Sequence, residues 1–141
     1  MVDTLSKEKR SWLMSQVSSK NTKPELAVRS LLHGIGYRFR LHASDLPGKP
    51  DIVFRSRKKV IFVHGCFWHG HQGCKYAKLP GTQVDFWAQK LDRNRMRDAR
   101  IIADLNAAGW QVYTVWQCEI KDLAATTAAL KKFLGPLSVV S

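Results

Sequence analysis

The chain has 141 residues, with 23 lysines and arginines against 11 aspartates and glutamates, which gives a net charge of +12. A hydrophobic share of 45% excludes a disordered chain, and the length suits one domain with one core. No apolar run is long enough to cross a bilayer and the N-terminus lacks a secretory signal, so we expect a cytoplasmic protein with no membrane partner. A compact domain this basic favours nucleic acid as its partner.

Two helices are expected before the first strand. The first is basic and covers residues 6–17, with Ser6 as its N-cap. The second begins at a Thr-x-x-Glu capping box formed by Thr22 and Glu25, with a proline in its first turn. Gly36 can end this helix.

Three strands follow in the middle of the chain. Residues 37–42 alternate between apolar and basic side chains, which is typical of a half-buried strand. Residues 51–54 and 60–64 are two more strands, and the short polar turn between them predicts a central hairpin.

The second half of the chain predicts a helix, a strand and a helix. These are a long helix over residues 84–108 that Gly109 ends, a buried strand over 110–116, and a helix from the N-cap Asp122 to about 134. The whole order indicates a mixed α/β fold, with helices layered on a central sheet.

Residues 64–74 hold three histidines and two cysteines, an unusual density of metal ligands. The chain has three cysteines in all, Cys66, Cys74 and Cys118. One loop histidine would complete a closed Cys₃His set that suits structural zinc and would clip the loop to the end of the last strand. The spacing allows either His69 or His71 as the fourth ligand.

A second group of polar side chains indicates hydrolytic chemistry. The 51–64 hairpin places Asp51 opposite residues 62–64, and Glu25 can add a second carboxylate from its helix. Such oxygen ligands suit Mg²⁺, which can polarise a phosphate. His64 lies at the same end of the hairpin, and His69, if it does not bind zinc, has a suitable pKa for activating water.

Six segments carry a family resemblance: the N-terminal basic helix and residues 21–25, 46–51, 60–74, 86–87 and 109–118. The run His-Gly-Cys-Phe-Trp-His at 64–69, followed by histidine and cysteine, is the most specific. The chain resembles the very-short-patch repair (Vsr) endonucleases of bacteria over nearly its whole length. The resemblance implies a restriction-endonuclease-like core in a single domain, with residues 1–20 contacting DNA and residues 22–135 forming the catalytic core.

That family nicks one DNA strand 5′ to the thymine of a T·G mismatch, which arises when 5-methylcytosine deaminates. The resemblance implies that Asp51 and the backbone carbonyl of Val63 bind Mg²⁺. Glu25 and His64 would act around the water shell of the metal, and His69 would be the general base. It assigns zinc to Cys66, His71, Cys74 and Cys118.

Two departures from the familiar family pattern fall in this region. The loop has one extra residue between His71 and Cys74, which still allows tetrahedral ligation. Position 63 is valine where threonine is familiar, which is harmless if only the carbonyl binds metal.

The resemblance also implies DNA contacts. Phe67, Trp68 and Trp87 would insert between base pairs, which costs least at a weakly held mismatch. Core packing is the alternative for aromatic residues, and it suits Phe86 and Trp110 best. Further contacts from the N-terminal segment and the start of the second helix are expected for Lys7, Lys9, Arg10, Trp12, Met14, Lys20 and Lys23.

The implied partner is double-stranded DNA with a T·G mismatch, bound by a monomer. A functional link to a cytosine-5 DNA methyltransferase is expected, and MutL is a further candidate partner. Two other readings stay open. A restriction-type endonuclease of related fold would cut both strands as a dimer and would not need an aromatic wedge. A non-catalytic, zinc-clipped DNA-binding module would keep its affinity without Asp51, His64 and His69.

Overall fold

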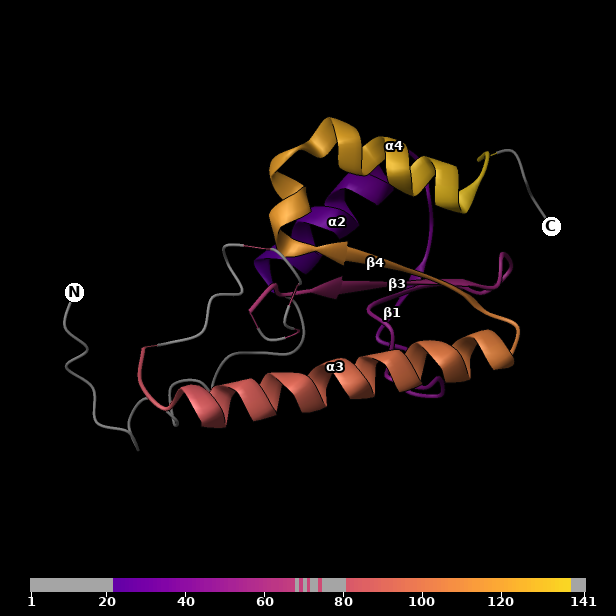
Figure 1. Cartoon of the computed structure of the whole chain (residues 1–141). Coiled ribbons are helices and arrows are strands. Elements are labelled where there is room, and N and C mark those ends of the chain that lie inside the picture. Colours follow the sequence, from indigo (N-terminus) through magenta and orange to yellow (C-terminus); the bar gives the residue numbers. More distant parts are fainter. Residues whose placement is uncertain (1–21, 68, 70, 72–73, 75–80, 138–141) are drawn as a thin grey trace.

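The computed structural model describes residues 22–67, 69, 71, 74 and 81–137 (Figure 1). The helix predicted over 6–17 lies outside the described residues. A four-stranded sheet in the order β1-β2-β3-β4 forms the centre, made of β1 (Arg40–Leu41), β2 (Ile52–Phe54), β3 (Lys59–His64) and β4 (Gln111–Trp116). β2 pairs antiparallel with both β1 and β3, whereas β3 and β4 run parallel. The predicted mixed α/β class and central hairpin are confirmed.

Helices cover both faces of this sheet. They are α2 (Lys23–Gly34), α3 (Val84–Ala107), the 3₁₀ helix η2 (Gln117–Lys121) and α4 (Leu123–Leu134). Figure 1 shows α2 and α4 on one face and α3 across the other. The parallel pair β3 and β4 is joined through α3, as parallel strands need a long crossover connection.

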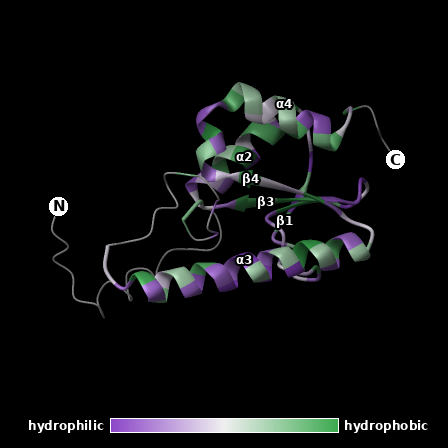
Figure 2. Ribbon diagram, viewed as in Figure 1, coloured by the Kyte–Doolittle hydropathy of each residue, from purple (hydrophilic) through white to green (hydrophobic). Residues whose placement is uncertain are grey.

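Alternating strand residues feed two separate cores. Ile52 and Ile61 pack with Leu32 of α2 and Leu130 of α4 on one face. Their neighbours in sequence point to the other face, where they meet Leu105 of α3. Figure 2 shows the central strands as strongly hydrophobic and α3 as banded, which fits a helix with one face on the sheet.

The N-caps predicted at Thr22 and Asp122 are present, whereas Ser6 lies outside the described residues. The hydroxyl of Thr22 accepts the backbone N–H of Glu25 at 3.4 Å. Likewise, the carboxylate of Asp122 accepts the N–H of Ala125 at 3.0 Å and starts α4. Gly36, with φ of 107°, follows α2 in a left-handed conformation that favours glycine.

Three predictions were wrong in detail. The strand expected to be buried over residues 110–116 is β4, at the edge of the described sheet, and Val115 is its one buried residue. The strand expected over residues 37–42 is only Arg40–Leu41, because the N–H of Tyr37 still bonds to Leu32 O at the end of the preceding helix. Phe86, expected in the core, is 50% exposed, while its neighbour Trp87 takes the buried position at 7%. The inward face of α3 therefore starts one residue later than expected.

The strand directions bring four chain segments to one edge of the sheet. This edge holds the C-terminal ends of β3 and β4, since these strands are parallel. It also holds the start of β2, which is antiparallel to β3, and the end of β1, which is antiparallel to β2. The polar residues singled out in the sequence follow or precede these ends.

Candidate active site and metal centres

Asp51 stands directly before β2 and faces the end of β3. Its Oδ2 accepts the backbone N–H of Val63 at 2.7 Å, so the predicted position opposite residues 62–64 is confirmed. Burial, together with the nearby carboxylate of Glu25, raises the pKa of Asp51 to about 7, although the Val63 bond acts in the opposite direction. A cation bound beside Asp51 would favour its ionised form, which burial disfavours.

Glu25 comes to the same place from the first turn of α2. It is 1% exposed, and its Oε2 accepts from His42 Nε2 at 2.8 Å and from Arg29 Nη1 at 3.1 Å. Ligand atoms of Glu25, His42 and Asp51 all lie within 4.8 Å of one another. Two carboxylates and an imidazole at this spacing fit a divalent cation.

A second cluster contains His64, His69 and Asp98. The two imidazoles stack with centroids 3.7 Å apart, and His69 Nδ1 bonds to Asp98 Oδ2 at 2.6 Å. Burial, followed by the neighbouring His69, lowers the pKa of His64 to about 4, so its ring is neutral at physiological pH. Among the described residues, His64 Nδ1 is the buried side-chain nitrogen or oxygen that lacks a hydrogen-bond partner.

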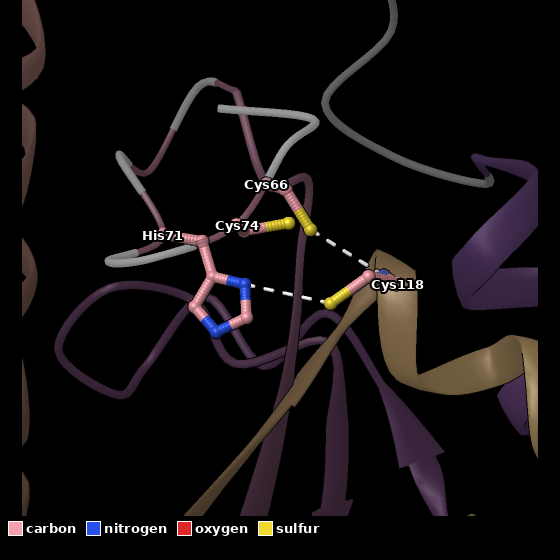
Figure 3. Close-up of side chains that lie close together, drawn as sticks. All are labelled: Cys66, His71, Cys74 and Cys118. Atoms are coloured by element: carbon pink, nitrogen blue, oxygen red, sulfur yellow. Dashed lines mark hydrogen bonds between the residues drawn. The ribbon is translucent and has the colours of Figure 1, made fainter. Parts of the chain in front are cut away.

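The third cluster ties the loop after β3 to η2. Side chains of Cys66, His71, Cys74 and Cys118 point toward one another (Figure 3), with ligand atoms within 4.8 Å. The N–H of Cys118 bonds to Cys66 Sγ at 3.4 Å, and His71 Nδ1 lies 3.5 Å from Cys118 Sγ. Burial and the neighbouring thiols raise the pKa of Cys118 to about 12. This group can hold a metal ion, which would displace the thiol protons.

The geometry separates the two histidines that spacing alone left equivalent. His71 lies with the cysteines, whereas His69 pairs with Asp98. Trp116 lies between the two clusters: its ring stacks on His71 at 4.1 Å and meets His64 edge-on at 5.3 Å. The cysteine–histidine cluster and the pair of stacked histidines therefore both pack against the side chain of Trp116.

The predicted DNA-contacting residues are only partly described. The ring of Phe67 meets that of Trp87 at 5.5 Å, and Lys90 lies over Trp87 at 5.8 Å. Lys23 is exposed at the start of α2. Outside the described residues lie Lys7, Lys9, Arg10, Trp12, Met14, Lys20 and Trp68.

Comparison with known proteins identifies the family. A family profile described as "DNA mismatch endonuclease Vsr" matches residues 2–75. The chain is 61% identical over 136 residues to "Type II nicking enzyme V.XorIIP" of Xanthomonas oryzae pv. oryzae, covering 96% of this chain and 99% of the relative. It is 41% identical over 121 residues to "DNA mismatch endonuclease Vsr" of Escherichia coli, covering 86% of this chain and 77% of the relative.

The chain belongs to the Vsr family.

Another relative, "Type II nicking enzyme V.NmeAIP" of Neisseria meningitidis, is 40% identical over 134 residues, which are 95% of each chain. Family membership makes this Vsr chain a DNA-directed nicking endonuclease. Its mixed sheet between helices agrees with the restriction-endonuclease-like core expected of the family. No helix in the described part of the chain is long and apolar enough to span a membrane.

Two residues of the candidate clusters were missed in the sequence. Asp98 lies seven residues after Leu91 and seven before Leu105, both buried on the inner face of α3, so helical periodicity alone would have pointed it inward. His42 is the residue opposite Asp51 when β1 is paired with β2, and its N–H bonds to Asp51 O at 3.1 Å. Pairing of residues 40–41 with residues 52–53 would have placed His42 opposite Asp51.

Proposed function

We propose that this chain nicks one strand of duplex DNA, 5′ to the thymine of a T·G mismatch left by deamination of 5-methylcytosine. The observation that carries the proposal is the adjacency, at one sheet edge, of a carboxylate pair and a stacked histidine pair. The carboxylates suit a divalent cation, and the histidines suit proton transfer. The names of the relatives describe mismatch endonucleases and nicking enzymes, which supports cutting of a single strand.

The catalytic cation in this proposal is Mg²⁺. Asp51 and the carbonyl of Val63 would hold it, with Glu25 acting through its water shell. Burial, and after it the nearby carboxylate of Glu25, raises the pKa of Asp51 to about 7, and a cation bound beside Asp51 would favour its ionised form, which supports a cation site. Bound Mg²⁺ would polarise the scissile phosphate and stabilise the leaving oxygen.

His69 is the proposed general base. Because its Nδ1 is bonded to Asp98, the ring orientation is fixed and Nε2 is the nitrogen that takes the proton of the attacking water. Water then attacks phosphorus, its proton goes to His69 Nε2, the bond from phosphorus to the leaving oxygen breaks, and that oxygen takes a proton from solvent water. His64, neutral and stacked on His69, can offer its buried Nδ1 to a water or a phosphate oxygen.

The third cluster is proposed as a structural zinc site. Four ligands, Cys66, His71, Cys74 and Cys118, complete a tetrahedral set and leave no open position for substrate. The site would fix the loop that carries Phe67 and His69. That role explains why a hydrolytic enzyme would place a closed metal site beside its reacting groups.

Mismatch recognition is assigned to the aromatic residues of this region. Phe67 and Trp68 would open the helix at the weakly held T·G step, where unstacking costs least. Trp87, predicted to insert as well, is buried against the ring of Phe67 and would support that wedge from the start of α3. The basic residues of segment 1–20 and Lys23 would contact phosphates, and Trp12 and Met14 the minor groove. Residues 22–135 would form the catalytic core of one monomeric domain.

The proposed setting is bacterial DNA repair in the cytoplasm. A cytosine-5 methyltransferase would create the base that later deaminates, and MutL is a candidate partner in the same process. Both links rest on the family resemblance.

The proposal is tested by nicking of labelled duplexes with one T·G mismatch, in varied flanking sequence, against matched T·A controls. We expect Mg²⁺-dependent cutting of the thymine strand only, and none with Asp51→Ala at unchanged fold and zinc content. Cutting of both strands of matched DNA would support a restriction-type enzyme instead. Binding without cutting at every flanking sequence would support a non-catalytic module.

A further inference from the structure

His42 occupies an unusual place beside the carboxylate pair. It follows β1 and contacts both acidic residues: its backbone N–H bonds to Asp51 O at 3.1 Å, and its Nε2 to Glu25 Oε2 at 2.8 Å. The side chain is 17% exposed. It therefore links the helix that carries one carboxylate to the strand end that carries the other.

The backbone of His42 is in a left-handed conformation, with φ of 48°. This conformation is unfavourable for a residue with a Cβ, and it persists only where surrounding contacts hold it. Here the backbone bond to Asp51 and the side-chain bond to Glu25 are those contacts. The same conformation occurs at Lys49, Lys58 and Gln83, and at His42 it accompanies a bond from the imidazole to a buried carboxylate, Glu25.

Glu25 needs such a contact to stay in place. It is almost wholly buried, and burial of an ionised carboxylate is costly unless donors surround it. Arg29 donates to Oε2 from one turn along the same helix, so that bond does not fix α2 relative to the sheet. The bond from His42 crosses from the sheet edge to the helix, and so joins the Glu25 carboxylate to the strand end beside Asp51.

We propose that His42 is a positioning residue for the catalytic cation. It donates Nε2–H to Glu25 and so holds the Glu25 carboxylate at the distance from Asp51 that lets both serve one divalent ion. The inference rests on the cation site of the proposed function and adds His42 to the residues that position its ligands. In this proposal the N–H donor positions Glu25, so another side chain that donates to the same oxygen would serve equally.

The test measures cation binding directly, with Mn²⁺ as the probe and the electron paramagnetic resonance signal of free Mn²⁺ as the readout. Zinc-loaded wild type is compared with His42→Ala, His42→Gln and the control His33→Ala, which removes an exposed imidazole at the end of α2. Thermal unfolding of each protein is recorded in parallel. Half-saturation of nicking by Mg²⁺ is then measured on a T·G duplex.

We expect His42→Ala to weaken Mn²⁺ binding about 10- to 100-fold, as loss of an outer partner of a metal-binding side chain typically does. His42→Gln should recover most of the affinity, because its amide can donate to the same carboxylate oxygen. A purely structural role predicts lower melting temperatures with unchanged affinity. Unchanged affinity in His42→Ala, or equal loss in His42→Gln, would overturn the inference.

Asp51→Ala separates this inference from the proposed function. If Asp51→Ala abolishes Mn²⁺ binding while His42→Ala leaves it intact, only the role of His42 is wrong. If Asp51→Ala also binds Mn²⁺ like the wild type, the cation site itself is wrong, and the role of His42 fails with it.

Discussion

Replacing Asp51 by asparagine should stabilise the cation-free protein while it abolishes nicking. Folding raises the pKa of this carboxyl from 3.8 to about 7, mainly through burial and then through Glu25. Between these two pH values the folded protein keeps a proton that the unfolded chain has lost, so stability falls as pH rises through this window. Asparagine has no charge to bury, and its side-chain oxygen can still accept the N–H of Val63.

The size of the effect follows from the same shift. A rise from 3.8 to about 7 corresponds to a penalty of about 4 kcal/mol near pH 8, and of about 2 kcal/mol near pH 5, where the folded wild type is already protonated. These figures are upper limits for the gain in the Asp51→Asn protein. The gain in the free energy of unfolding should therefore be about half as large near pH 5 as near pH 8.

The assay is urea unfolding of both proteins without added Mg²⁺, near pH 5 and near pH 8. Asp45→Asn is the matched control, because Asp45 is exposed and its hydrogen bond with Arg55 lowers its pKa. That control should show no gain. Added Mg²⁺ should narrow the difference in unfolding free energy between the two proteins, because it stabilises only the wild type. An Asp51→Asn protein that is less stable than the wild type near pH 8, or that gains equally at both pH values, would refute the reasoning.

Three further predictions concern separate parts of the structure. Asp98→Asn should lower the nicking rate by about 100-fold with the fold intact, because His69 loses the carboxylate that orients it; equal rates in single-turnover assays would contradict this. Cys118→Ser should reduce the zinc content and the melting temperature, measured by atomic absorption and calorimetry; full zinc retention would count against the closed site. Leu130→Ala, at 0% exposure in the α2–α4 core, should destabilise the protein by about 2–5 kcal/mol in urea unfolding, while the nicking rate stays normal below the transition.

Much of the fold could be predicted because local signals dominate it. Thr22 and Asp122 cap their helices through short-range bonds, and the hairpin turn sets the register that places Asp51 opposite Val63. The meeting of Cys66 and Cys118 follows from the parallel pairing of β3 and β4, which ends both strands at one edge.

What the sequence did not reveal depends on helical phase and on long-range pairing. The start of α3 has no side-chain cap, since Gln83 stands there in a left-handed conformation. The first turn has no cap that sets the phase of the helix, so Phe86 was expected inside in place of Trp87, although the spacing of Leu91 and Leu105 further along defines the inward face. His42 needed the register of a strand only two residues long.

The central claim is tested most directly by mapping the cut. Duplexes with one T·G mismatch and randomised flanks, labelled separately on each strand, would be incubated with enzyme and Mg²⁺, and the products sequenced. We predict a single break, immediately 5′ to the mismatched thymine, in a subset of flanking sequences that defines the site. Breaks in both strands, or equal cutting of T·A and T·G duplexes, would contradict the account.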